Sequence, residues 1–396
     1  MKAEPCEGNL RICCPVPGIP PGFRMTGVAR YDLNLLRELA LLGARIEVVR
    51  ADGESLSEKG GDAGRRGMPA PIGAVCSSGG AGRRLSQLTQ VPRAVRSLYN
   101  ERGFDLLRVH SFFSSSLQTL WLQRIYKLPV PVVVHFHHLD PNRWRNVVVR
   151  AVLKRSDAII TFSEASKQDA VERLGIASEK IHVVYHGIER RFRPGPPDVN
   201  LLRDLGCSQE DRILLFLGDL EPRKNPLFLL DILKDLLPAH RNVRLVFCGT
   251  GELLHVIRRS AKDMGLAHRV VLTGAIPEGQ EVDYYNLSEI FVFPTALEGF
   301  GFPIVEAMSC GKPVVAFRAS AIPELVEDRV TGFLVSPLEK EQFVRRISLL
   351  LEHKELSVQL GTRGRERVDR LFRWERAAKE TLNIYQETVK QFRSGR

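Results

Sequence analysis

The sequence lacks several features that would place it in a specialised class of protein. Its seven cysteines, an odd number, include no Cys-x-x-Cys pair, so neither a disulfide framework nor a zinc site is indicated. No apolar run is long enough to span a bilayer, and the first nine residues are too polar to begin a secretory signal. The cytosol is therefore the expected compartment.

The composition is that of an ordinary globular protein. The 396 residues are 44% apolar and 26% charged, which favours two domains, each large enough to have its own core. Short apolar runs alternate with amphipathic stretches along the chain, and this alternation predicts an α/β fold built on doubly wound parallel sheets.

The net charge of +11 is unevenly distributed. Residues 1–190 hold 27 lysines and arginines against 18 acidic residues, so +9 of the charge lies there. This half is expected to meet an anionic partner. No helix-turn-helix, zinc-finger or RNP-type signature supports nucleic acid. A membrane surface or a phosphorylated acceptor fits better, and an ordinary arginine-rich solvated surface is the alternative.

One stretch combines a strand end, a glycine loop and a helix start. Ile290 to Phe293 is an apolar run that Pro294 stops, which is typical of a buried strand. The glycines at 299 and 301 allow the backbone to approach a ligand closely and to expose its N–H groups. Pro303 suits the first turn of the helix that follows.

Two acidic residues lie in this stretch. Glu298 is in the loop, and Glu306 is expected in the first helical turn. An ionised carboxylate accepts hydrogen bonds from the vicinal hydroxyls of a sugar or a ribose. Taken singly, Glu306 is better explained as complementing the helix dipole and Glu298 as a solvated acid. Together with a glycine loop at the carboxyl end of a strand, they favour a ligand site.

The stretch from Glu298 to Glu306 resembles the Glu-x7-Glu motif of the retaining nucleotide-sugar glycosyltransferases with the GT-B architecture (glycosyltransferase family 4-like, group 1). The flanking residues 293–294 and 306–315 agree with that motif, and the resemblance covers nearly the whole chain, most weakly over 52–103. It implies two Rossmann-like domains that face a central cleft. These are an N-terminal acceptor domain (1–191), a linker (192–200), a C-terminal nucleotide-sugar domain (201–371) and a final helix (372–396) that crosses back.

The resemblance implies roles for residues of the C-terminal domain. Arg223 and Lys224 follow its first strand and would stabilise a departing diphosphate, unless they are merely solvated loop cations. Many relatives carry an arginine at the position of Asp219, so Arg223 is expected to substitute for it. Glu298 would bind the transferred sugar and Glu306 the ribose. The residues expected to bind the donor are Gly218, Gly299, Phe300, Gly301, Phe302 and Glu306.

The resemblance also implies roles in the N-terminal half. The strand predicted over 129–136 runs into His137, which occupies the position of a family histidine that faces the donor sugar. His135 is expected on the opposite face of the strand or deeper. A glycine loop that contains Gly27 and Arg30 resembles the family's N-terminal loop, with its role in acceptor or phosphate binding left open.

Two further segments of the N-terminal half are less family-like. Residues 52–82 are rich in Gly, Ser and Pro, which predicts a mobile surface loop. Arg83 to Arg102 predicts one or two short amphipathic helices, interrupted at Pro92, with a basic face. That face suits peripheral contact with an anionic membrane, and an ordinary surface helix is the alternative.

These observations predict a retaining glycosyltransferase. The resemblance implies transfer of a hexose from a nucleotide-sugar of the GDP-mannose or UDP-glucose type to a glycan, lipid-linked or small-molecule hydroxyl. The sequence has no Asp-x-Asp motif, so we expect neither a metal nor another cofactor, and we expect a cytoplasmic enzyme, perhaps peripheral at the inner membrane face. Two other classes stay open: a catalytically silent GT-B binding protein, and an epimerase or phosphorylase on the same fold.

Overall fold

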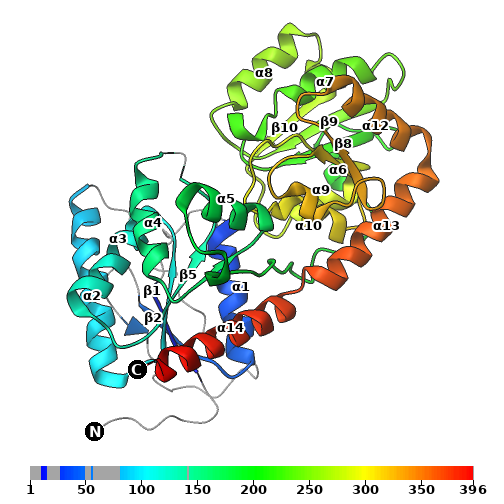
Figure 1. The fold of residues 1–396 in the computed structure, drawn as a ribbon. Helices are drawn as coiled ribbons and strands as arrows, with labels where there is room; N and C mark the ends of the chain where they lie inside the picture. The colour runs from blue at the N-terminus through cyan, green and yellow to red at the C-terminus, as the bar shows by residue number, and fades with distance from the viewer. Residues whose placement is uncertain (1–9, 16–26, 50–54, 57–80, 141, 396) are drawn as a thin grey trace. The chain divides into compact units, whose positions relative to one another are not determined.

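The computed structural model describes residues 10–15, 27–49, 55–56, 81–140 and 142–395, with only the backbone for 27–30, 55–56 and 81–87. Internal contacts divide the chain into two units (Figure 1). The first contains residues 1–186 and 374–396, and the second contains residues 187–373. The predicted connector at 192–200 therefore lies inside the second unit, where its last two residues already belong to a helix.

The first unit is built on a seven-stranded sheet. Its strand order is β3-β2-β1-β4-β5-β6-β7, and every neighbouring pair is parallel except β2 and β3. The central strands β4, β5 and β6 are buried along their whole length, because parallel strands carry helices on both faces. The strands are β1 (Arg11–Pro15), β2 (Arg45–Val49), β3 (Ser55–Leu56), β4 (Leu106–His110), β5 (Val132–Phe136), β6 (Ala158–Thr161) and β7 (Ile181–Val183).

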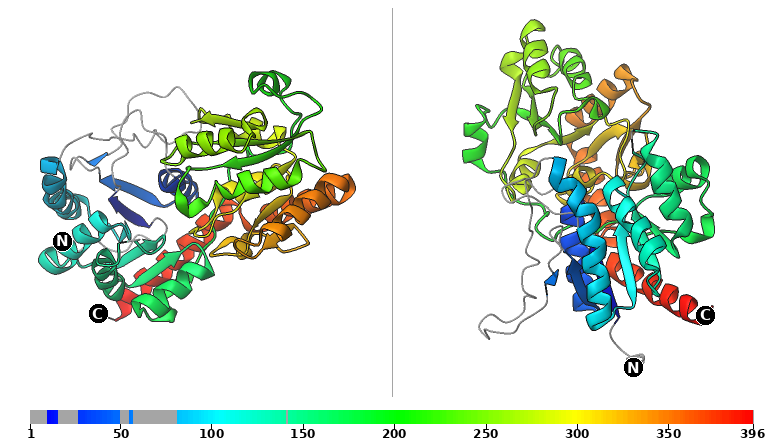
Figure 2. Two further views of the ribbon diagram at one scale, coloured as in Figure 1. Left: turned by 90° about the horizontal axis from the view of Figure 1, so that it is seen from above. Right: turned by 90° about the vertical axis from the view of Figure 1, so that its left-hand side faces the viewer.

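The helices of the first unit come from both ends of the chain. The last helix, α14 (red in Figure 2), packs against α1, and α3 packs against α4. The helices are α1 (Gly27–Leu41), α2 (Ala81–Arg102), α3 (Phe113–Trp121), the π-helix η1 (Leu122–Tyr126), α4 (Arg145–Arg155), α5 (Glu164–Leu174), the 3₁₀ helix η2 (Ser178–Lys180) and α14 (Trp374–Ser394).

The second unit is built on a six-stranded parallel sheet. Its strand order is β10-β9-β8-β11-β12-β13, so the order reverses between β8 and β11. In open α/β sheets, this reversal is where ligands bind, at the carboxyl ends of the strands. The strands are β8 (Arg212–Leu217), β9 (Val243–Cys248), β10 (Val270–Gly274), β11 (Ile290–Phe293), β12 (Val314–Phe317) and β13 (Gly332–Val335).

Short helices connect these strands, and two longer ones follow the last strand. The apolar helix α7 packs on α12, and α10 packs on α13. The helices are α6 (Val199–Asp204), η3 (3₁₀, Pro222–Lys224), α7 (Phe228–Leu236), α8 (Leu254–Asp263), η4 (3₁₀, Ala267–Arg269), α9 (Glu281–Leu287), α10 (Phe302–Ser309), α11 (Ile322–Leu325), α12 (Lys340–Glu352) and α13 (Lys354–Leu371).

The segment over 83–102 is one continuous helix, α2, rather than two. Pro92 lies inside it without ending it, because Val91, Val95 and Leu98 bury one side of the helix in the core and tertiary packing offsets the lost backbone hydrogen bond. The predicted loop at 52–82 lies mostly outside the described residues, apart from the two-residue strand β3 and the start of α2. Over the described part of the chain, no helix combines the length and apolarity needed to cross a bilayer.

Candidate active site

The site in the second unit is built where β8 and β11 end. The two strands pair in parallel at the reversal of strand order, so their carboxyl ends lie at the same edge of the sheet. Gly218 follows β8, and the loop that contains Glu298 follows β11. The sequence therefore brings two chain segments about eighty positions apart to one place.

Gly218 lets a lysine come close to the end of β8. Its φ of +152° is rarely adopted by other residues, and a Cβ at this position would lie 3.0 Å from Nζ of Lys224. Lys224 is buried, with 6% of its surface exposed, and its ammonium lies 5.5 Å from the centre of the Phe293 ring. A lysine is seldom this buried without a binding role, so its position suggests a charge intended for a ligand.

Glu298 lies beside two cations without a direct hydrogen bond to either. Its Oε2 atom is 3.7 Å from Nζ of Lys224 and 3.6 Å from Nη1 of Arg223. Oε2 is buried and accepts no hydrogen bond from the described residues. Arg223 is held in place by Oε2 of Glu221 at 2.8 Å and by the main-chain oxygen of Leu297 at 3.3 Å. The carboxylate thus keeps an oxygen available for a hydroxyl donor.

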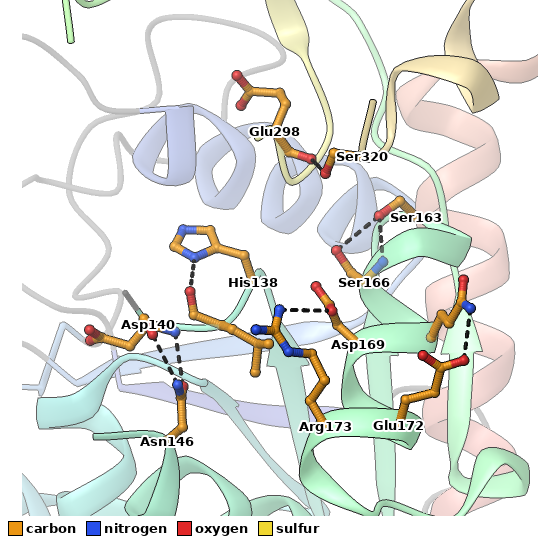
Figure 3. Close-up of polar contacts among 12 residues, drawn as sticks. His138, Asp140, Asn146, Ser163, Ser166, Asp169, Glu172, Arg173, Glu298 and Ser320 are labelled. Atoms are coloured by element: carbon orange, nitrogen blue, oxygen red, sulfur yellow. Dashed lines mark hydrogen bonds and ion pairs between the residues drawn. The ribbon is translucent and has the colours of Figure 1, made fainter. Parts of the chain in front are cut away.

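The loop between Glu298 and α10 has a fixed backbone. Gly301 precedes the helix with a φ of +110°, and a Cβ there would lie 3.0 Å from Cδ1 of Leu325. Figure 3 shows that the Ser320 hydroxyl donates to the main-chain oxygen of Glu298, at 2.7 Å. Phe300 is buried in this loop and contacts Phe302 edge to face. The predicted donor loop is therefore ordered by packing on both sides.

Glu306 differs in position from the sequence prediction. Helix α10 begins at Phe302, so Glu306 lies in its second turn rather than its first, and only 2% of its surface is exposed. The Tyr285 hydroxyl donates to its Oε2 atom at 2.7 Å. Burial, together with the charge of Glu306, raises the pKa of Tyr285, which therefore remains a donor. The sequence reasoning missed Tyr285, because this contact joins two helices.

His137 belongs to the first unit, directly after β5. It is buried and lies on the same face as His135, since both rings contact Tyr31 and Phe162. Of the two alternatives predicted for His135, the deeper position is right and the opposite face is wrong, because residues two apart on a strand share a face. His135 bonds Tyr31 at 2.7 Å and Tyr385 at 2.6 Å, which ties α1, β5 and α14 together.

A buried polar chain leads to His137. Arg108 donates to Oδ1 of Asp32 at 2.5 Å, and Nε2 of His110 lies 2.8 Å from Oδ2 of the same carboxylate. Nδ1 of His110 lies 2.8 Å from Nε2 of His137. The sequence reasoning missed these three partners, although the signal was visible: Arg108 and His110 interrupt an apolar strand at alternate positions.

The protonation states of this chain follow from burial and charge. Burial alone would raise the pKa of the Asp32 carboxyl, but Arg108 and His110 hold it well below its usual range. Burial lowers the pKa of His110, with Asp32 opposing and Arg108 adding to the effect. Burial and then the neighbouring His110 and His186 lower the pKa of His137 strongly. At neutral pH, the aspartate is ionised and both rings are neutral.

The remaining predicted positions are only partly described. Gly27 is the first residue of α1, whereas the side chain of Arg30 and the preceding loop lie outside the described residues. The same is true of the arginines at 83 and 84 in the basic helix α2. Within the described ranges, no three His, Cys, Asp or Glu side chains are grouped so that they could hold a metal ion.

Comparison with known proteins adds independent information. Residues 200–367 match the profile "Glycosyl transferases group 1", and residues 25–192 match "Glycosyltransferase Family 4". D-inositol 3-phosphate glycosyltransferase of Segniliparus rotundus is 29% identical over 301 residues, which are 71% of this chain and 66% of that protein. The uncharacterized glycosyltransferase MJ1607 of Methanocaldococcus jannaschii is 26% identical over 235 residues. That alignment covers 57% of this chain and 59% of the relative, so the chain spans less than two thirds of both relatives.

Solved structures share the fold. Sucrose-phosphate synthase from Thermosynechococcus elongatus has a TM-score of 0.77 and 19% identity, over 96% of this chain and 100% of that one. Anabaena Alr3699/HepE in complex with UDP has a TM-score of 0.74 and 20% identity, with the same coverage.

The fold and its two Rossmann-like sheets are those of the GT-B class of glycosyltransferases. The two profile matches extend this statement from the fold to the family. The chain belongs to the group 1, family 4 glycosyltransferases, which transfer a sugar from a nucleotide-sugar donor.

Proposed function

We propose that the chain is a retaining, metal-independent glycosyltransferase that moves a hexose from a nucleotide-sugar to the hydroxyl of a glycan, a lipid-linked molecule or a small molecule. The observation that carries the proposal is the cluster of Lys224, Arg223 and Glu298 at the carboxyl ends of β8 and β11. Two cations suit a diphosphate, and a carboxylate oxygen without a hydrogen bond suits a sugar hydroxyl.

In this proposal, Lys224 and Arg223 stabilise the negative charge that develops on the departing diphosphate. The buried ammonium of Lys224 acts at low effective dielectric, so its charge is worth more than that of a solvated lysine. Gly218 is required because any side chain there would meet Lys224. The exposed Arg223 takes the place of the arginine that many relatives carry at the position of Asp219.

The acidic residues bind hydroxyls. Glu298 accepts hydrogen bonds from the transferred sugar, and Glu306 accepts them from the ribose while Tyr285 fixes its carboxylate. The residues of the loop, Gly299 to Phe302, offer main-chain N–H groups to the donor at the start of α10. In the first unit, His137 contacts the donor sugar, and the loop at Gly27 and Arg30 serves the acceptor or a phosphate. The donor phosphate itself is the candidate base for the acceptor hydroxyl.

The donor is the least determined part of the proposal. GDP-mannose and UDP-glucose were both expected from the resemblance. The Anabaena protein is known in complex with UDP-glucose, which makes UDP-sugars the first donors to try. The name of the Segniliparus relative indicates an acceptor that carries a phosphate, and the excess positive charge of residues 1–190 is compatible with such an acceptor.

We also propose that α2 touches an anionic membrane from the cytoplasmic side. Its arginines and its length as a single 22-residue helix support this. Flotation with liposomes that contain anionic lipid, at low salt, tests it. Retention of the protein in the bottom fraction under those conditions would reject membrane contact.

The other functional classes are less well supported. A silent GT-B protein has no need for a buried lysine beside a carboxylate that accepts no hydrogen bond from the described residues. An epimerase or phosphorylase on this fold would still bind a nucleotide or sugar phosphate, but the two family profiles match transferases.

The test is release of nucleotide from a panel of UDP-, GDP-, ADP- and dTDP-sugars, with and without EDTA. We expect release from one donor class in the presence of EDTA. We further expect a loss of activity in Glu306→Gln but not in Glu341→Gln, which alters an exposed glutamate of α12 in the same unit. Release that EDTA abolishes would contradict metal independence. An absence of release and of nucleotide binding with every donor would reject the proposed function.

A further inference from the structure

His137 is the end of a hydrogen-bonded chain rather than an isolated histidine. The chain runs from Arg108 through Asp32 and His110 to His137, and each member is at least nine-tenths buried. Among the described residues, none bonds the second ring nitrogen of His137, Nδ1. The proton at one end of the chain therefore determines what the other end offers to a ligand.

The position of each proton follows from the partners. Arg108 can only donate, so the Asp32 carboxylate receives its proton at Oδ1. Oδ2 of the carboxylate, an acceptor, places the proton of the neutral His110 ring on Nε2. Nδ1 of His110 is then an acceptor and must receive the proton of His137 Nε2. This leaves Nδ1 of His137 as a lone-pair acceptor.

We infer that Asp32 and His110 are positioning residues that hold His137 in the Nε2–H tautomer, so that His137 accepts a hydrogen bond from a sugar hydroxyl instead of donating one. This inference rests on the proposed contact between His137 and the donor sugar. The role of Arg108 is to orient the carboxylate of Asp32.

A single substitution should reverse both tautomers. In Asp32→Asn, the amide oxygen must face Arg108, because Arg108 cannot accept, and the NH₂ group then faces Nε2 of His110. That nitrogen becomes an acceptor, so the proton of His110 moves to Nδ1 and is donated to Nε2 of His137. His137 is left with its proton on Nδ1, where a sugar hydroxyl now meets a donor. A wrong tautomer with intact geometry is known to reduce catalysis strongly.

The matched control makes the same chemical change elsewhere in the first unit. Asp169→Asn also removes a carboxylate that pairs with an arginine, Arg173, on an exposed face of α5, and this contact is drawn in Figure 3. It touches none of the histidines of the chain. We expect the control to leave both tautomers and the activity unchanged.

The first readout is the tautomer itself, by long-range ¹H–¹⁵N correlation spectra of the full chain labelled with ¹⁵N-histidine. We expect the Nε2–H pattern for His110 and His137 in the wild type and the Nδ1–H pattern for both in Asp32→Asn. An Nδ1–H pattern for either ring in the wild type would overturn the inference. The wild-type spectrum decides this even if the variant does not fold, and it does so without any turnover.

The second readout is kinetic. In Asp32→Asn, we expect kcat/KM for the nucleotide-sugar to fall roughly tenfold or more, while the affinity for the free nucleoside diphosphate stays at the wild-type value because that ligand carries no sugar. Reversed tautomers with unchanged kcat/KM would overturn the role toward the sugar. Failure of the proposed function is seen separately, as a wild-type protein that releases no nucleotide.

Discussion

At the scale of single residues, the two cations near Glu298 differ chiefly in their exposure to water. The side chain of Lys224 is 8% exposed, whereas that of Arg223 is 41% exposed and already paired with Glu221. A charge in water is screened, but a buried charge acts at nearly full strength on a nearby anion. The adjacent residues 223 and 224 are therefore not equivalent, although the sequence alone gave them the same role.

We predict that Lys224→Met lowers kcat/KM for the nucleotide-sugar by about 10²- to 10³-fold, the usual effect of removing one group that stabilises transition-state charge. Methionine keeps the contact with Phe293 and removes only the charge. Steady-state kinetics measures the effect, and thermal unfolding checks the fold. Lys340→Met is the control, since Lys340 forms an exposed ion pair with Asp235 on α12. Equal activity in both variants would remove Lys224 from the mechanism.

Sequence reasoning named residues of the site but not the residues that support them. Glu298, Lys224 and His137 stand out because charged or polar groups follow apolar strands. Their supporting partners, such as Tyr285 and His110, lie on other elements and are joined to them only by folding. Periodicity cannot show such contacts, because it reports the face of an element and not what lies opposite that face.

At the scale of elements, the apolar runs of the second unit predicted its strands closely. The runs at 290–293, 314–317 and 332–335 coincide with β11, β12 and β13, because buried parallel strands are short and apolar throughout. Helix limits were harder, since α2 continues through Pro92 and Glu306 falls one turn later than expected. In both cases, tertiary packing and loop geometry decide the outcome, and a local pattern does not contain them.

The cap of α5 offers a test at this scale. Ser163 accepts a hydrogen bond from the main-chain N–H of Ser166 at 3.1 Å, as the sequence predicted, and its hydroxyl donates to Oγ of Ser166 (Figure 3). We predict that Ser163→Ala lowers the free energy of unfolding of the first unit by about 1 kcal/mol. Urea denaturation measures it, with Ser178→Ala as the control because that serine caps no helix. A loss no larger than that of the control would mean that solvent replaces the cap.

At the scale of the whole molecule, the two units can be observed separately. All three tryptophans, at positions 121, 144 and 374, belong to the first unit. The Trp374 ring lies 5.8 Å from Tyr31 and 6.1 Å from His186, inside the histidine-rich region. Tryptophan fluorescence therefore reports the unfolding of the first unit, and a nucleotide that binds the second unit provides its separate signal.

The buried histidines should make the first unit sensitive to mild acid. Burial is the main cause that lowers the pKa values of four of them, His110, His135, His137 and His186. Asp32 partly opposes the shift at three of these histidines, whereas Arg108 adds to it at His110 and His135. In the unfolded chain, each histidine takes up a proton near pH 6.5. Below that pH, the unfolded state binds more protons than the folded state, so the stability falls as the pH falls.

We predict that the free energy of unfolding of the first unit is smaller at pH 5.5 than at pH 7.5, with each histidine contributing at most about 1.4 kcal/mol per pH unit. Asp32 does not cause this change, because its lowered pKa keeps it ionised over this range. Urea titrations followed by tryptophan fluorescence measure the difference. His138→Gln, which changes an exposed histidine after β5, should leave the difference unchanged. Equal stability at the two pH values would show that the buried rings accept protons without unfolding, and would contradict the neutral His110–His137 pair.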